Sequence, residues 1–373
     1  MRRKGKYIHE LADWPRFRWD QVRLALPLAE VRHRQGRLIG RMEALGFALR
    51  QEASLEALTS DAVETSKIEG ETLDAEQVRS SLARRLGVDI GALAPVDRDV
   101  EGIVEVTLDA AANFRAPLTD ERLFGWHAAL FPTGRSGITK VRVGAWRDDA
   151  YGPMQVVSGP IGRETVHYEA PKAERLGPEM AAFTRWFNGA DEADPVLKAA
   201  LAHLWFVTLH PFDDGNGRIA RAIADMQLAR SEGTAQRFYS LSAQIRRERA
   251  AYYAILERTQ KGDLDVTDWV EWFLACLDRA IEAAYVELET VLGKAKFWER
   301  VRSVALNERQ RGVLNRLLDG FEGKLTTSKW AKLAKCSHDT ALRDIQDLLR
   351  RGILAQNEAG GRSTSYRLVQ DQG

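Results

Sequence analysis

Apolar residues recur at helical spacing along most of the chain. Leu24, Leu28 and Val31 form one such series, and the run 196–209 is apolar on every side, so both predict helices. The segment 141–166 differs, because short alternating runs are interrupted there by Gly, Pro and Asp. We therefore predict a mainly α-helical fold with one or two β-hairpins standing on a helical body.

Breaks in this pattern divide the chain into three predicted domains. Residues 87–96 hold two Gly and one Pro, and this stretch separates an N-terminal helical domain, 1–95, from a central domain, 96–300. A third domain, 301–373, is predicted from its own sequence of helices and strands.

The last domain has the pattern of a winged helix. Helices are predicted at 307–318, 327–334 and 337–351, and two short strand-like runs follow within 353–368, separated by Gly360-Gly361. The residues Asn307, Thr327 and Ser337 stand at the three helix starts, where their side chains can accept an unpaired backbone N–H, so we predict them as N-caps.

Composition narrows the class of protein. The 373 residues are 45% hydrophobic and 29% charged, which is typical of globular chains and unlike disordered or collagen-like ones. The 54 Lys and Arg nearly balance the 53 Asp and Glu, so contact with nucleic acid or anionic lipid would have to come from a local patch. Cys276 and Cys336 are the only cysteines, too few for a disulfide framework or a cysteine zinc site. Without a signal-peptide pattern or a long apolar run, we expect a cytoplasmic protein with no membrane contact.

The residues 210–221, HPFDDGNGRIAR, lie between two apolar helical runs and predict a helix–loop–helix turn. Gly215, Asn216 and Gly217 can turn backbone N–H groups inward, and the next helix adds the positive end of its dipole. Together these form a cradle for an anion, and phosphate is the expected one. Arg218 and Arg221, three apart on that helix, can bind further phosphate oxygens in bidentate fashion.

Two further side chains complete the predicted site. Asp214 offers a hard oxygen ligand where Mg²⁺ on a nucleotide would need one. His210 is the one group of this loop suited to accept a proton near neutral pH. The loop therefore predicts a phosphate site with a metal ligand and a proton acceptor beside it.

This segment resembles the Fic family motif, in which a His, a Phe, an acidic residue, Gly-Asn-Gly-Arg and a second Arg follow in the same order and spacing. The resemblance implies a Fic helical core and transfer of AMP from ATP to a hydroxyl side chain of a target protein. It also implies that His210 deprotonates the hydroxyl, Asp214 holds Mg²⁺, and Gly215, Asn216, Gly217 and Arg218 bind phosphates. Arg221 would position the γ-phosphate.

An N-terminal segment, 63–70, resembles the inhibitory motif of Fic proteins. Thr65 and Glu69 are four residues apart and share a helix face, and Gly70 is a natural helix stop. The resemblance implies that Glu69 pairs with Arg221 and keeps it from the γ-phosphate.

The resemblance covers nearly the whole chain. Residues 14–20 and 78–87 look like the N-terminal domain of unknown function that many bacterial Fic proteins carry. The segment 142–166 falls where Fic proteins have a flap, a hairpin whose free edge can bind an extended target by β-augmentation. Met154, Val156 and Val157 are the predicted flap residues; an ordinary two-stranded cover on the helices is the alternative.

Residues 301–373 leave a second class of function open. They hold 13 Lys and Arg against 8 Asp and Glu, and a basic winged helix suggests DNA binding. Asp339, Asp344 and Asp347 lie on the helix that would meet DNA and would repel phosphate, so a protein partner is the alternative. The two hypotheses are a self-inhibited adenylyltransferase and a transcription regulator with a nucleotide-sensing core.

Several properties stay open within the enzyme class. Transfer of UMP or phosphocholine, and removal of AMP with Glu69 placing a water, are alternatives to AMP transfer. The expected acceptor is a Ser, Thr or Tyr hydroxyl of a target protein or of the chain itself. The resemblance further implies a homodimer.

Overall fold

The computed structural model describes residues 7–91, 93–150, 152–160, 163–190, 193–318, 323–357 and 364–369. It separates into two compact units, Met1–Ala284 and Tyr285–Gly373, which are considered one at a time. Within the described ranges, none of the helices combines the length and apolar composition needed to cross a bilayer.

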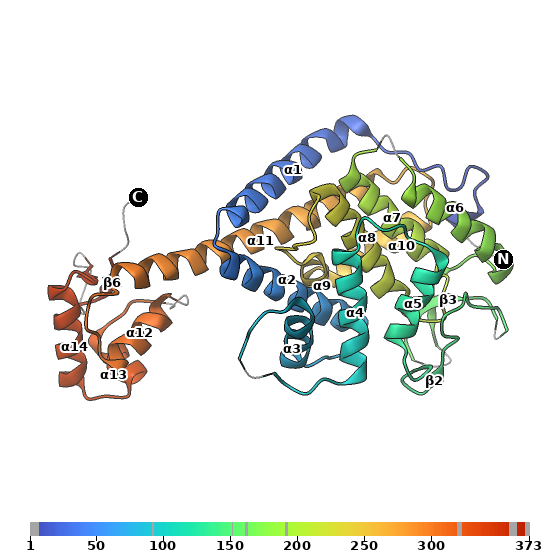
Figure 1. Cartoon of the computed structure of the whole chain (residues 1–373). Coiled ribbons are helices and arrows are strands. Elements are labelled where there is room, and N and C mark those ends of the chain that lie inside the picture. Colours follow the sequence, from blue (N-terminus) through green and yellow to red (C-terminus); the bar gives the residue numbers. More distant parts are fainter. Residues whose placement is uncertain are drawn as a thin grey trace. The chain divides into compact units, whose positions relative to one another are not determined.

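The first unit is an assembly of helices (Figure 1). In chain order they are α1 (Gln21–Glu43), α2 (Phe47–Ile68), α3 (Ala75–Leu86), α4 (Arg98–Ala112), α5 (Asp120–Leu130), α6 (Leu176–Asn188), α7 (Pro195–Leu209), α8 (Asn216–Glu232), α9 (Leu241–Arg247) and α10 (Arg249–Gln260), with short 3-10 turns η1 (Ile8–Glu10) and η2 (Ala173–Arg175). The long helix α11 (Thr267–Arg300) follows them. The mainly helical fold class is therefore confirmed.

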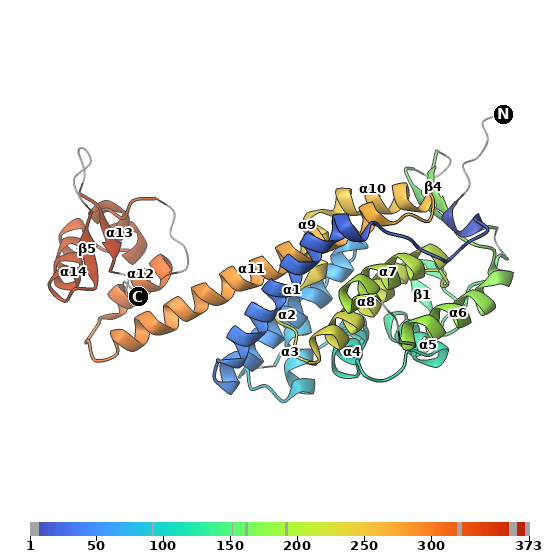
Figure 2. The same cartoon turned by 90° about the horizontal axis from the view of Figure 1, so that it is seen from above.

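The helix α7 forms the centre of this unit. Its residues from Val196 to Leu209 are all buried, which agrees with a helix that is apolar on every side. Asp194 caps its first turn and Pro195 occupies the first position, where the missing N–H costs nothing. Helix α8 lies alongside α7 in both views (Figures 1 and 2), so the loop between them is fixed on two sides by the core.

Two hairpins stand on the helices. Strands β3 (Gln155–Ser158) and β4 (Thr165–Glu169) pair antiparallel, with an irregularity between Val156 and Val157. β3 lies inside the predicted hairpin segment 141–166, whereas β4 begins near its end and extends three residues beyond it. A smaller pair, β1 (Arg135–Ser136) and β2 (Thr139–Lys140), precedes that segment rather than lying inside it.

The second unit has the predicted order of helices and strands: α12 (Glu308–Leu318), α13 (Thr327–Ala334), α14 (His338–Arg350), β5 (Leu354–Gln356) and β6 (Tyr366–Leu368). It has a core of its own around Trp330. Asn307 exchanges hydrogen bonds with Gln310 at the start of α12, and Ser337 caps α14.

One predicted cap in this unit is wrong by a single position. Thr326, not Thr327, accepts the N–H of Lys329, because Thr326 has the extended backbone of an N-cap and Thr327 is already the first residue of the helix. The glycines Gly360 and Gly361 lie outside the described residues.

Candidate functional site

The loop between α7 and α8 is shaped by two unusual backbone positions and one side chain. His210 ends α7 with φ 48° and Gly215 begins α8 with φ 80°, so both reverse the chain in left-handed conformations. Between them the side-chain amide of Asn216 accepts the N–H of Phe212 at 2.9 Å and donates to its carbonyl oxygen at 2.8 Å. Both polar atoms of the Asn216 side chain are therefore engaged in holding the loop closed.

Two glycines of this segment have close neighbours at the place a Cβ would take. A Cβ at Gly215 would lie 2.8 Å from the Phe131 ring, and one at Gly217 would lie 2.2 Å from Oε1 of Glu69. A carboxylate thus lies directly against the first turn of α8, where backbone N–H groups and the helix dipole favour an anion.

The electrostatics of His210 suit a proton acceptor. Burial lowers the pKa of its imidazole to about 4, so the ring is neutral at pH 7. Its Nδ1 lies 3.3 Å from the carbonyl oxygen of Val207, and a proton placed there leaves the lone pair on Nε2. The pattern of residues identified this histidine, and its surroundings supply the reason it can act as a base.

Arg147 lies outside this loop in the sequence and holds it by hydrogen bonds. Sequence reasoning missed this residue. Its side chain is fully buried, and Nε donates to the carbonyl oxygen of His210 at 2.8 Å. Its other nitrogens contact Asp149 and the carbonyl oxygen of Pro171, while its backbone N–H bonds to Pro211. No periodicity marks this residue, because it lies in an irregular segment 63 positions from its main partner.

Asp214 lies half-buried on the loop, where its carboxylate accepts the Ser136 hydroxyl and the Gly215 N–H. Within the described ranges, no three His, Cys, Asp or Glu side chains gather as ligands for a metal ion. A single carboxylate nevertheless fits Mg²⁺, which commonly takes one or two protein carboxylates and completes its shell with phosphate oxygens and water.

The predicted inhibitory residues meet the predicted γ-phosphate ligand. Arg221 is 1% exposed, and its Nε donates to the Thr65 hydroxyl at 2.7 Å. One terminal nitrogen, NH2, donates to the Thr65 carbonyl oxygen at 3.0 Å and to Glu69 Oε1 at 2.7 Å. Gly70 follows with φ 89°, so the chain leaves α2 at the point where the carboxylate reaches Arg221.

A second carboxylate from the same turn meets the other arginine. Oε2 of Glu71 accepts a hydrogen bond from Arg218 NH1 at 2.6 Å, and the Arg218 guanidinium stacks over the Phe131 ring. Burial raises the pKa of the Glu71 carboxyl. Sequence reasoning missed Glu71, because only the end of α2 at Ile68 brings residue 71 round to α8.

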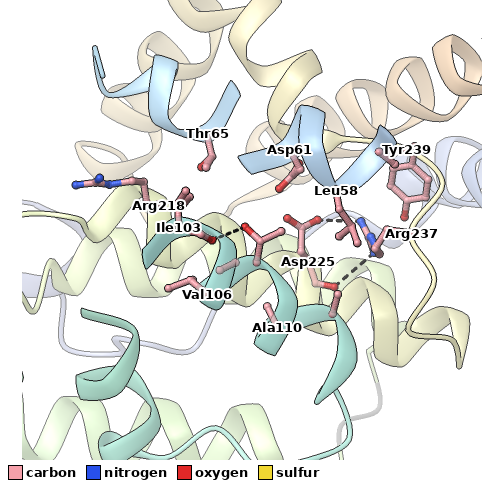
Figure 3. Close-up of a pocket in the computed structure, with 14 residues that line it drawn as sticks. Leu58, Asp61, Thr65, Ile103, Val106, Ala110, Arg218, Asp225, Arg237 and Tyr239 are labelled. Carbon is pink, nitrogen blue, oxygen red and sulfur yellow. Dashed lines mark hydrogen bonds and ion pairs between the residues drawn. The ribbon is translucent and has the colours of Figure 1, made fainter. Parts of the chain in front are cut away.

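Next to these contacts, residues of α2, α4 and α8 line a pocket (Figure 3). Arg218 and Thr65 reach it from the site, while Asp61 of α2 and Asp225 of α8 lie near one another within it. Arg237 donates to Asp225 at 2.8 Å, and burial raises the pKa of the Asp225 carboxyl well above its usual range. Asp61 and Asp225 therefore place two carboxyl groups where α2 lies next to α8.

The predicted flap residues lie on or beside the β3–β4 hairpin. Val156 and Val157 belong to β3, Met154 precedes it, and Val157 is 47% exposed. At the base of the hairpin the Tyr168 hydroxyl donates to the carbonyl oxygen of Thr208 at 2.7 Å. The hairpin is thus attached at the end of α7, next to the loop.

The fold and this loop first define a class: a mainly helical protein whose arginine-lined turn at a helix N-terminus suits an anion. Comparison with known proteins then identifies the domain that carries this loop. Residues 117–228 match the Fic/DOC family, so the chain carries a Fic/DOC domain and the resemblance of its loop is confirmed. Residues 7–88 match a domain of unknown function, DUF4172.

Several curated relatives share one name. "Protein adenylyltransferase Fic" of Drosophila ananassae is 26% identical over 239 residues, which are 63% of this chain and 43% of that protein. The protein of the same name from Culex quinquefasciatus is 27% identical over 248 residues, 65% of this chain and 44% of that protein. The chain therefore spans less than half the length of these relatives.

Solved structures support the fold. A Fic family protein from Desulfovibrio desulfuricans aligns with a TM-score of 0.52 at 20% identity, covering 94% of this chain and 97% of the other. A Fic domain containing signaling protein from Bacteroides thetaiotaomicron aligns with a TM-score of 0.51 at 21% identity, covering 69% and 95%.

Proposed function

We propose that this protein transfers AMP from ATP to a Ser, Thr or Tyr hydroxyl of a target protein, and that its own N-terminal region inhibits the transfer. The main support is the position of the Glu69 carboxylate, between Gly217 and Arg221 at the start of α8. A bound phosphate would have its ligands at this same place. The names of the curated relatives agree with the reaction.

The chemistry follows from the loop. The acceptor hydroxyl oxygen attacks the α-phosphorus of ATP, the bond to the pyrophosphate oxygen breaks, and the hydroxyl proton passes to Nε2 of neutral His210. Backbone N–H groups at the start of α8, with Arg218 and Arg221, neutralise the phosphate charge. Asp214 would hold Mg²⁺, which supplies further charge neutralisation when bound.

Inhibition is proposed to act on both arginines. Glu69 occupies one nitrogen of Arg221, and Glu71 occupies one nitrogen of Arg218, so neither guanidinium presents its full set of donors to a phosphate. ATP can still enter, but its α-phosphate would not be held in line for attack, which lowers rate more than affinity.

The test is a mass measurement with a base-deficient control. Glu69→Gly protein, with Mg²⁺ and each of the four nucleoside triphosphates in turn, is weighed intact for self-modification. We expect the mass of AMP to be added from ATP, and no addition when His210→Ala is combined with Glu69→Gly. Addition of UMP would change the assigned nucleotide, and full labelling of the His210→Ala variant would remove His210 as the base.

The transferred group, the oligomeric state and the alternative function are also proposals. Phosphocholine transfer and AMP removal are distinguished by the same measurement, with a phosphocholine donor or a pre-modified protein as the substrate. A homodimer in the cytoplasm is our expectation for the assembly. The second candidate, a nucleotide-sensing regulator, is favoured only by the arrangement of α13 and α14 in the second unit.

A further inference from the structure

Helices α13 and α14 form a helix–turn–helix. α13 ends at Ala334 and α14 begins at His338, which leaves a turn of three residues. Lys335 opens the turn in a left-handed conformation with φ 50°, and Ser337 closes it by capping α14 through the Thr340 N–H at 3.2 Å. A turn of this length between two helices is the arrangement that places a second helix in the major groove of DNA.

The faces of α14 are sharply divided. Its buried residues are Ala341, Asp344, Ile345 and Leu348, while His338, Asp339, Leu342, Arg343, Gln346 and Arg350 are exposed. The buried set faces the core around Trp330, which is itself 0% exposed. Arg and Gln are the side chains that pair in bidentate fashion with guanine and adenine edges, so the outward face carries base-reading groups.

The acidic residues of α14 do not oppose DNA in the way the sequence suggested. Asp344 is 6% exposed and accepts from Arg309 and Asn307, both at 3.1 Å. These contacts hold Asp344 against the start of α12.

Asp347 is likewise engaged by neighbouring side chains. It accepts from Gln310 of α12 at 3.1 Å and pairs with Arg351 at 2.9 Å. Of the three aspartates expected to repel phosphate, only Asp339 remains on the exposed face. Asp339 is therefore the one acidic side chain on the exposed face of α14 that carries Arg343 and Gln346.

We propose that the second unit binds duplex DNA, with α14 in the major groove and Arg343 and Gln346 at base edges. The exposed side chains of Lys332 and Lys335 contact phosphates on the approach. This activity is separate from nucleotidyl transfer, since it uses none of the residues of the α7–α8 loop.

The test is fluorescence anisotropy of the full chain with a fluorescein-labelled duplex of about 24 base pairs, which exceeds two helical turns, in a random-sequence pool. We expect binding with a dissociation constant of about 10⁻⁶ to 10⁻⁴ M, weakening steeply as salt rises. Arg343→Glu should weaken binding on the order of tenfold or more. Lys335→Ala should lower the salt slope by about one. Arg302→Glu makes the same charge change as Arg343→Glu at a side chain 80% exposed outside the helix–turn–helix, and should bind nearly as wild type.

A second measurement addresses the acidic residue that remains. Asp339→Asn should bind the pool more tightly, whereas a protein-binding surface would not respond to DNA at all. Each variant is checked by its melting temperature, so that unfolding is not taken for lost binding. Failure of the wild-type chain to bind the duplex at low salt would overturn the proposal and assign this face to a protein partner. Equal loss from Arg302→Glu and Arg343→Glu would overturn the placement of α14.

Discussion

Replacing Glu69 by Gly removes one carboxylate from an otherwise intact cluster. Arg221 keeps its hydrogen bonds to the Thr65 hydroxyl and carbonyl oxygen, so the guanidinium should stay in place. The lost contact is a charged hydrogen bond of 2.7 Å to a carboxylate whose side chain is 28% exposed. Such bonds contribute about 1.5 to 3 kcal/mol. If a phosphate must displace this bond, its removal should raise transfer by about 10- to 150-fold.

The assay is self-labelling with α-labelled ATP at saturating nucleotide, so that differences in affinity do not enter. Glu69→Gln is a matched control, because it keeps the shape and one hydrogen bond but removes the charge, and it should lie between wild type and Glu69→Gly. Glu69→Gly with Arg221→Ala should be as inactive as Arg221→Ala alone, since both changes act through one phosphate contact. A Glu69→Gly variant no faster than wild type, or a highly active double variant, would refute the reasoning.

Four further outcomes follow. In the Glu69→Gly background, Glu71→Gln should raise self-labelling again by severalfold, because Arg218 regains a donor; an unchanged rate contradicts the role of Glu71. Arg147→Lys should lower kcat on the order of tenfold with little change in the KM for ATP, because a lysine cannot replace the several directed hydrogen bonds that the Arg147 guanidinium makes at the loop. Steady-state kinetics test this. Burial lowers the pKa of His203 from 6.5 to about 3, so the unfolded chain takes up a proton below pH 6.5 that the folded chain does not. Between about pH 6.5 and pH 3 this residue should therefore lower the free energy of unfolding by about 1.4 kcal/mol for each pH unit, and the fall measured by urea denaturation should be smaller in His203→Gln. Trp330→Ala should destabilise the second unit by about 3 to 5 kcal/mol in calorimetry while self-labelling persists.

The helices and the loop could be predicted because local pattern determines them. A long apolar run such as 196–209 predicts a buried helix in almost any context. The glycines of the loop predict a turn, because glycine readily adopts the backbone angles that turns require. Contacts between distant segments could not be predicted. Arg147 and Glu71 reach the site from irregular segments of the chain. The path of such segments leaves no periodic pattern in the sequence, so these two contacts could not be predicted.

Two side chains make contacts that differ from those the sequence suggested. Asn216 was predicted to bind nucleotide, and its amide is engaged with the backbone of Phe212, so shaping the cradle is the role its contacts support. Asp344 was expected to face solvent and is buried, because the rotational position of α14 depends on packing against α12. The direction of a polar side chain on a short amphipathic helix is decided by such tertiary contacts.

If Glu69 inhibits as proposed, the end of α2 and the phosphates of ATP compete for one cation, Arg221. The coupling is reciprocal. If productive ATP binding weakens the attachment of α2 to Arg221 by some factor, then loosening that attachment strengthens productive ATP binding by the same factor. A change far from the loop can therefore set the rate of transfer. Asp61 accepts hydrogen bonds from Ser240 and Ser242, and this attachment holds α2 at a point one turn before Thr65. A ligand or target that pulled α2 from that attachment would act as an activator without touching the nucleotide.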